Sequence, residues 1–452
     1  MPDQKDRVNF EWAVGESDWD HNTEMMDFTP PPPPRVVQGM RRISRRALAA
    51  VGAILTVVAL LIGWKMWHDA QVGLEHIRQD IQATADMETW AWYNQDTDSL
   101  ASLISPNASN SWRTRMQYSL NRLRETIGAS LGAPQTVLSD PEVHDNTAVV
   151  RVRVTLPTGP AATATTLAET RYYERQADGV WRQTSPDGRF WGDTRQASSE
   201  HFAISYNTRD HRAVVAALPR LEALYTQLVA DLGLKDLPQT PFSIVVLPTL
   251  DNTTFRVSDD RRLAVASPEL LLSPANLQYD DILVRSIASP LASYLILEAN
   301  QRQASQRGSA LVRSPFALMG VAQWLVATTT KLPMDFQAQT EEQFRAALGD
   351  GYRPSLTNNN PGFGVPNGNG PNARQRGFAT VQMTGYSLAE FVAERYGRAK
   401  VGEMIRVLGS GLPWDETVQQ VFGTDIKTFE NDWRAFVLQR YGGEPSASAA
   451  IP

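Results

Sequence analysis

The chain has 452 residues, carries a formal net charge of −6 and contains no cysteine. The acidic balance argues against a nucleic acid partner, because phosphate binding needs a basic surface, and the lack of cysteine excludes disulfides, thiolate metal sites and a cysteine nucleophile. With 42% apolar and 20% charged residues, the composition is that of a protein with buried cores, and the length allows roughly two or three domains.

Residues 1–46 are expected to form a cytoplasmic tail. Residues 1–29 hold eight acidic, two basic and four aromatic side chains, and the polyproline run Pro30–Pro34 is expected to be extended. One interpretation is a solvated, disordered tail. The alternative is that residues 1–34 form a short acidic and aromatic peptide that docks on a cytoplasmic protein partner.

An apolar segment follows the tail. Ala47–Trp64 contains 18 residues and no charge. As a helix it would span about 27 Å, close to the thickness of a hydrocarbon core. Because Lys65 and Trp67 suit the membrane interface, we expect an uncleaved transmembrane helix at Ala47–Trp67. The alternative is a buried core helix, although such a helix rarely lacks nearly every polar residue.

The charges that flank this segment predict its orientation. Five arginines lie within the 12 residues before it, from Arg35 to Arg46, whereas Lys65 and Arg78 follow it among acidic residues. The positive-inside rule therefore predicts a single-pass protein of the cell membrane, with a cytoplasmic N-terminus and extracytoplasmic C-terminal domains.

Residues 69–196 are expected to form an α+β domain. Two stretches with helical spacing precede three strand patterns, which predicts helices packed on one face of a curved antiparallel sheet. The helical stretches are residues 69–95 and Ser111–Ile127, and the strands are Thr147–Leu156, Leu167–Arg175 and Gly179–Thr184.

One stretch of this domain resembles a known superfamily. Glu169–Gly192, which reads ETRYYERQADGVWRQTSPDGRFWG, resembles the closing hairpin of cone-shaped domains in the nuclear transport factor 2 and polyketide-cyclase-like superfamily. The resemblance implies a cone-like sheet around an apolar pocket, which either takes a small apolar ligand or serves only for docking. The candidate pocket aromatics are Trp90, Tyr172, Trp181 and Trp191, and the alternative is that they are core residues.

Residues 198–442 are expected to form a second, mostly helical domain, and residues 443–452 a disordered C-terminus. The strand patterns are Glu200–Tyr206, Phe242–Leu247 and Arg262–Ala266. The helical patterns are Asp210–Gly233, Asp280–Glu298, Phe316–Thr328, Glu341–Leu348, Tyr386–Leu408, Trp414–Phe422 and Lys427–Tyr441.

This order of elements resembles the peptidase MA-like, or gluzincin, family. The C-terminal stretch Gly385–Tyr441 carries the resemblance best, and it is similar to the helical tail of membrane-anchored members. The family's chemistry needs an HExxH motif on one helix, which supplies two zinc ligands and a general base, and a glutamate ligand on the next helix.

The residues needed for this chemistry are missing, since no histidine follows His211. In the helix DDILVRSIASPLASYLIL, Arg285 and Ser289 stand at the histidine positions and Ser286 at the position of the base; in LMGVAQWL, Met319 replaces the glutamate ligand. Arginine stays protonated and serine is a poor zinc ligand. We therefore expect a degenerate site without catalytic residues, metal or cofactor. Pro290 should kink or restart its helix near Ser289.

The sequence thus favours a catalytically inactive, peptidase-like region that acts as an interaction or ligand-sensing module tethered to the membrane. Two alternatives remain open. One is a transmembrane regulator that signals through its cytoplasmic tail. The other is an enzyme with an unrecognised site that uses no metal, with His144 or an aspartate of the first outer domain as its base.

Overall fold

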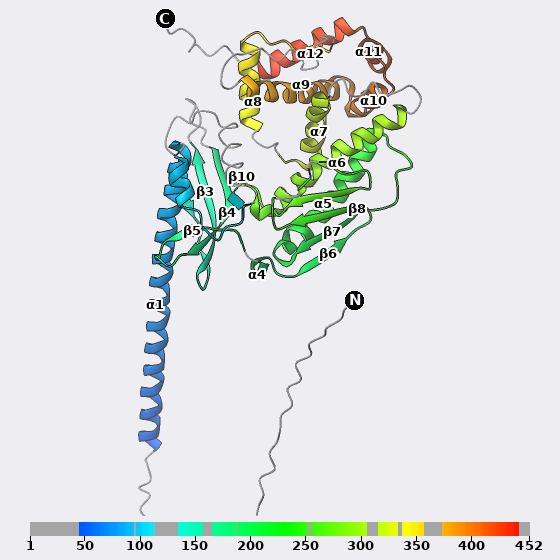
Figure 1. Ribbon diagram of the computed structural model, residues 1–452. Coiled ribbons are helices and arrows are strands. Elements are labelled where there is room, and N and C mark those ends of the chain that lie inside the picture. The colour runs from blue at the N-terminus through cyan, green and yellow to red at the C-terminus, as the bar shows by residue number, and fades with distance from the viewer. Residues whose placement is uncertain are drawn as a thin grey trace, which may run out of the picture. The chain divides into compact units, whose positions relative to one another are not determined.

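The computed structural model describes residues 45–94, 96–110, 112–113, 134–156, 165–186, 188–250, 253–254, 256–304, 315–332, 337–356 and 373–442. These residues form a mixed structure of helices and sheets, which confirms the α+β character expected from the sequence (Figure 1). The chain divides into two compact units, Met1–Asp69 and Ala70–Pro452. Three predicted segments lie outside the described residues. They are residues 1–44 of the tail, the C-terminus expected to be disordered (residues 443–452) and nearly all of the predicted helix Ser111–Ile127.

Helix α1 is continuous from Arg45 to Asn94. In the first unit its apolar side chains are exposed, among them Leu60 at 68% and Trp64 at 62%. In the second unit the helix has one buried face, on which Ile81 and Ala85 have no exposed surface. The apolar segment and the first helix of the folded region are therefore parts of a single element (Figure 1).

The first sheet has six antiparallel strands. Its order is β1-β3-β4-β10, with β2 also paired to β3 and β5 to β4. The strands are β1 (Gln135–Leu138), β2 (Glu142–His144), β3 (Thr147–Leu156), β4 (Thr165–Arg175), β5 (Trp181–Gln183) and β10 (Ser273–Pro274). In β3 the alternation predicted from TAVVRVRVTL puts Ala148, Val150, Val152 and Val154 in the core with Ile81 of α1.

The second sheet has the order β6-β7-β8-β9. Strand β6 (Thr194–Ser198) pairs antiparallel with β7 (Phe202–Asn207), whereas β7, β8 (Phe242–Leu247) and β9 (Arg262–Ala266) are parallel. Helix α5 (His211–Leu232) links β7 to β8, packs against β7, and ends at Gly233, whose φ is 59°. The predicted stop at Gly233 is confirmed, because glycine adopts the left-handed conformation without a steric penalty.

The expected boundary between residues 196 and 198 does not separate the two sheets. Strand β6 begins at Thr194, yet it belongs to the second sheet. Strand β10 lies far beyond the boundary, yet it pairs with β4 of the first sheet. The described residues of this part also form two short helices, α2 (Thr97–Ser102) and α4 (Gly188–Trp191), and two 3-10 turns, η1 (Thr208–Asp210) and η2 (Pro268–Leu270).

Helix α6 (Tyr279–Ala304) is unbroken at Pro290, so the expected restart near Ser289 is wrong. Proline inside a helix costs about 3 kcal/mol, because it removes a hydrogen bond and its ring crowds the preceding turn. The helix persists because the residues around the proline are anchored in the core. Ile287, Ala288, Leu291 and Ala292 are at most 1% exposed.

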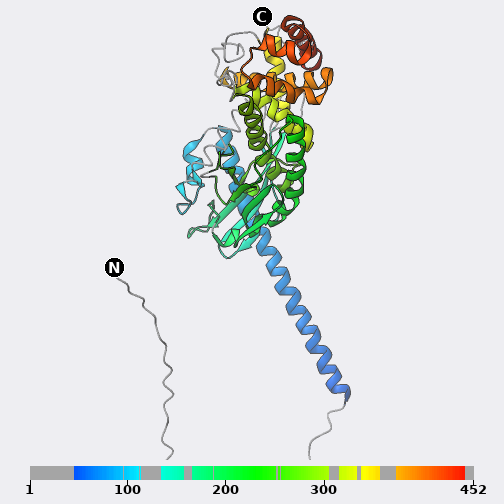
Figure 2. The same cartoon turned by 90° about the vertical axis from the view of Figure 1, so that its right-hand side faces the viewer.

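Among the residues that the structure describes, six further helices follow α6. In both views the orange and red helices gather at one end of the second unit (Figure 2). The six helices are α7 (Pro315–Thr330), α8 (Gln337–Gly349), α9 (Ala373–Tyr396), α10 (Arg398–Gly409), α11 (Trp414–Phe422) and α12 (Ile426–Tyr441). Gly397, with a φ of 94°, divides the predicted stretch Tyr386–Leu408 into α9 and α10.

Candidate functional site

The residues predicted to mark a degenerate metal site lie on two helices that pack against each other. Arg285, Ser286 and Ser289 are half-buried on α6, and Met319 is half-buried on α7. The hydroxyl of Ser286 donates a hydrogen bond to the carbonyl of Ile282 at 2.9 Å, which is a local helix contact. Among the described residues, no group of three or more His, Cys, Asp or Glu side chains is placed to hold a metal ion.

The four candidate pocket aromatics do not line one pocket. Tyr172 and Trp191 lie in one cluster with ring centroids 6.4 Å apart, whereas Trp181 lies in another core with Tyr173 and Ile81. Neighbouring residues of β4 point to opposite faces of the sheet, which separates Tyr172 from Tyr173. Trp90 is 59% exposed on α1. Tyr172, Trp181 and Trp191 are therefore core residues of two packed clusters, and Trp90 is a surface residue.

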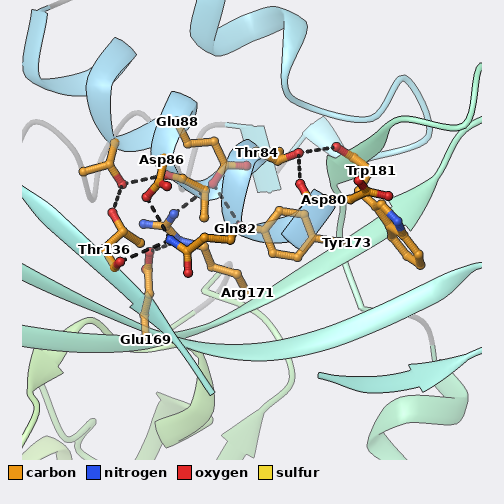
Figure 3. Close-up of polar contacts among 12 residues, drawn as sticks. Asp80, Gln82, Thr84, Asp86, Glu88, Thr136, Glu169, Arg171, Tyr173 and Trp181 are labelled. Atoms are coloured by element: carbon orange, nitrogen blue, oxygen red, sulfur yellow. Dashed lines mark hydrogen bonds and ion pairs between the residues drawn. The ribbon is translucent and has the colours of Figure 1, made fainter. Parts of the chain in front are cut away.

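A buried ionic cluster joins α1 to β4 (Figure 3). Arg171 lies 2.8 Å from Oε2 of Glu88 through Nη1 and 2.7 Å from Oε1 of Glu169 through Nε. The Tyr173 hydroxyl donates a hydrogen bond to the same Glu88 oxygen at 3.1 Å. The β4 residues alternate, so Glu169, Arg171 and Tyr173 share the face that α1 covers. The side chains of Glu88 and Arg171 are only 3% and 10% exposed.

Burial dominates the electrostatics of this cluster. It raises the pKa of Glu88 from 4.5 to about 7, although Arg171 and the Tyr173 hydroxyl both favour the charged form. Burial also raises the pKa of Tyr173 well above its ordinary value, and the neighbouring Glu88 raises it further. Oε1 of Glu88 has no hydrogen-bond partner in the structure. The cluster can therefore take up and release a proton near neutral pH, but a solute cannot reach Glu88 in this conformation.

Neutral hydrogen bonds surround the ionic cluster and attach α1 to two further strands. The Gln82 side chain donates to the carbonyl of Thr136 on β1 at 3.1 Å, and the Thr136 hydroxyl donates to the Thr89 hydroxyl at the same distance. The Thr84 hydroxyl donates to the carbonyl of Trp181 on β5 at 3.2 Å (Figure 3). Polar contacts therefore help to define how α1 sits on the sheet.

Glu88 and Arg171 were not predicted from the sequence, although the sequence contains a signal for a buried acid at Glu88. Ile81, Ala85 and Glu88 recur at helical spacing, so a carboxylate falls on the apolar face of α1. A charged residue at such a position requires a buried partner. The sequence does not say which of the many arginines supplies it.

A pair formed by a histidine and a glutamate bears on the hypothesis of an unrecognised enzyme. Nδ1 of His201 lies 2.6 Å from Oε2 of Glu222, and the backbone N–H of His201 donates to Oε1 at 2.8 Å. Such a pair can orient an imidazole, but both contacts also fasten the start of β7 to α5. His144, the base considered above, is exposed at the end of β2 and belongs to neither cluster.

Three described helices are long and apolar enough to cross a membrane, where the sequence analysis expected one. They are Gly52–Asn94, Thr208–Leu232 and Tyr279–Asn300. The buried share of their most apolar windows is 0%, 39% and 56%, respectively. Composition and length alone therefore support association with a membrane, without selecting one helix.

Comparison of the chain with known protein families and with curated proteins found no match.

Proposed function

We propose that the chain is a single-pass membrane protein, anchored by Ala47–Trp67, whose folded region is an extracytoplasmic interaction module without peptidase activity. The observation that carries the anchor is the complete exposure of the apolar window in α1, compared with the substantial burial of the other two candidates. Exposed apolar surface costs about 25 cal/mol per Å² in water, and a bilayer removes that cost.

The other two candidate helices fit better as parts of the core. Helix α5 links β7 to β8, and these strands are hydrogen-bonded neighbours in a parallel pair. A helix that crossed a bilayer between them would place the two strands on opposite sides. Helix α6 packs against α5, α7 and α10 and buries Leu283, Ile287 and Leu295 completely or nearly so. Burial in the core of the folded region therefore explains why both helices are rich in apolar residues.

The topology can be tested by labelling single cysteines, because the natural chain has none. Asn22→Cys marks the tail, and Gln419→Cys marks an exposed position of α11. On intact cells, a membrane-impermeant maleimide should label only Gln419→Cys, and after lysis it should label both. The unaltered chain is the matched control and should not react. Labelling of Asn22→Cys on intact cells, or release of the protein by alkaline carbonate, would overturn the proposal.

We further infer that α6 and α7 belong to a peptidase MA-like scaffold that has lost its metal ligands. The order of the second sheet's β7, then α5, then β8 and β9, followed by the two-residue strand β10 of the first sheet and by α6, supports this inference. So do Arg285, Ser289 and Met319 at the positions where the family needs histidine and glutamate. The purified full-length protein should contain far less than one zinc per chain and should not hydrolyse peptides. Stoichiometric zinc in the purified protein would contradict the inference.

Docking is favoured over small-ligand binding for the first sheet. On its α1 face, Ile81, Tyr173 and Trp181 are at most 1% exposed and pack in one core. Side chains that fill the space between helix and sheet compete directly with a ligand for it. The surface of this domain is therefore the more suitable place for a partner.

A further inference from the structure

The two sheets of the second unit are joined by an ionic contact. Arg209 of η1 lies 2.8 Å from Oε1 of Glu269 on η2 through Nε, and 3.1 Å from Oε2 of Glu142 on β2 through Nη1. Beside this contact, Ser273 of β10 pairs with Ala168 of β4. We call the group of Asp210, Glu269, Arg209, Ser267 and Glu142 the joint cluster.

Two carboxylates of the joint cluster are buried with an oxygen unsatisfied. Asp210 is 2% exposed and Glu269 is 5% exposed. Oδ1 of Asp210 accepts a hydrogen bond from the Ser267 hydroxyl at 2.7 Å, whereas Oδ2 has no partner among the described residues. Oε2 of Glu269 likewise has none. A buried, unpaired charge is strongly unfavourable, so these two oxygens are poor sites for full ionisation.

The charges around the two acids leave an excess of negative groups. Glu142 of β2 adds a third carboxylate, and Arg209 is the cation that contacts it and Glu269. From β3, Arg151 acts on Glu269 over a longer distance, and its Nη2 donates to the carbonyl of Leu277 at 3.3 Å. Three acids thus face two cations.

Two weaker groups complete the surroundings. The Tyr279 hydroxyl of α6 is hydrogen-bonded to Thr170 of β4 at 3.0 Å, and burial raises its pKa, as does Glu269. His211, which follows Asp210 in the chain, shares a hydrogen bond of 2.9 Å with the Tyr206 hydroxyl. Both therefore already have partners other than the unsatisfied oxygens.

We propose that this joint is a proton-controlled contact between the two sheets, closed while the pair Asp210 and Glu269 holds at least one proton, so that Glu269 can stay ionised against Arg209, and opened when both acids become charged. A proton on either acid leaves at most one buried negative charge on the pair and removes the repulsion between the acids. Loss of those protons leaves more negative charge in the joint than Arg209 and Arg151 balance, so water must enter to solvate it.

The sign of the response follows from the pKa of each acid. Burial and, to a smaller extent, the neighbouring Glu269 raise the pKa of Asp210 from 3.8 to about 7, although Ser267 and Arg209 lower it; burial also raises the pKa of Glu269, although Arg209 lowers it. In an open joint both acids return to ordinary values. The closed form is therefore favoured fully below those ordinary values, and the preference is lost as the pH rises through about 7. Because the two acids interact, the protons leave as a coupled pair.

The test measures the separation of the sheets as a function of pH. Spin labels on Gln135→Cys of β1 and Gln196→Cys of β6, both at exposed positions, report the distance in the full-length protein in nanodiscs. We expect one narrow distance in acid and a second, longer population near neutral pH. The ratio of open to closed protein should rise by up to about tenfold per pH unit for each proton released.

Two matched variants make the result specific. Asp210→Asn with Glu269→Gln should keep the acid-state distance at every pH, whereas Glu88→Gln, which removes a buried acid outside the joint, should leave the response unchanged. A distance in the unaltered protein that is independent of pH would overturn the proposal, as would an unchanged response in the double variant. Restoration of the short distance by Ca²⁺ or Na⁺ at alkaline pH would also overturn it, because the oxygens would then hold a metal ion.

A second measurement covers the case in which the double variant does not fold. Hydrogen exchange of the unaltered protein reports on the segment Pro268–Leu270, where the amide of Glu269 donates to the Ser267 hydroxyl at 3.3 Å. After correction for base catalysis, protection of this segment should fall between acid and neutral pH. Constant protection would contradict the proposal.

Discussion

Glu88 and Arg171 form an ion pair of 2.8 Å inside the core, one on α1 and the other on β4. The pair attaches the folded part of α1 to the first sheet by a contact that is both charged and shielded from water. Such a contact is sensitive to the loss of either partner and to the proton on Glu88.

Glu88→Gln should flatten the dependence of stability on pH. The pKa of Glu88 is raised from 4.5 to about 7 in the folded protein. Its contribution to stability is therefore complete below about 4.5 and is lost as the pH rises through 7. Urea unfolding of the full-length protein between these pH values should show a smaller loss of free energy in the variant. Asp86→Asn, at an exposed position two residues away, is the control and should keep the slope of the natural protein.

Arg171→Met should destabilise the protein by about 3–5 kcal/mol above neutral pH, because it leaves the charge on Glu88 unpaired in the core. Adding Glu88→Leu should recover much of this loss, since both buried charges are then gone. A double-mutant cycle measured by urea unfolding checks the coupling. Arg175→Met, on the same strand but exposed, should change stability by less than about 0.5 kcal/mol. Additive effects of Arg171→Met and Glu88→Leu would argue against the pair.

Gly402→Ala should destabilise the protein, although alanine favours an isolated helix by about 1 kcal/mol. A Cβ at Gly402 of α10 would overlap the backbone oxygen of Asp231 on α5. We expect a loss of about 1–3 kcal/mol in chemical unfolding, because backbone cannot move aside as a flexible side chain can. Gly349→Ala, where a Cβ would meet nothing within 4 Å, is the matched control. Equal stability of the two variants would show that α5 and α10 are not in close contact.

Arg398→Lys should lower the melting temperature even though the charge is kept. Nε and Nη2 of Arg398 bind Oδ2 of Asp231 at 2.8 and 2.6 Å, and Nη1 and Nη2 also donate to the hydroxyls of Thr328 and Thr329. Lysine cannot reproduce this fork, so one or more of these groups loses its partner, at about 1–3 kcal/mol. Lys400→Arg, in a more exposed ion pair with Glu403, should have little effect.

Local patterns in the sequence were sufficient for many elements. Alternation predicted β3 as Thr147–Leu156 and β9 as Arg262–Ala266, and both bounds are confirmed. Glycine chemistry predicted the end of α5 at Gly233. These predictions succeed because the conformation depends on neighbours within a few residues.

Features that depend on distant partners were not predicted. Whether the aromatics line a pocket or fill a core stayed open, because nothing local to Tyr172 or Trp181 reveals which face of the sheet each will occupy. Pro290 favoured a helix break, yet the packing of Ile287 and Leu291 outweighs that preference. The pairing of Glu88 with Arg171 joins residues 83 positions apart, and only the folded chain brings them together.

The two-residue strand β10 has a consequence for modularity. It belongs to the later part of the chain, yet it covers Leu167 and Ala168 on β4, which are almost fully buried. A fragment that stopped after β6 would expose this apolar edge with unpaired backbone groups, a known template for aggregation. The first sheet therefore depends on a strand from a later part of the chain, and a rearrangement of this protein that keeps this edge paired has to retain β10.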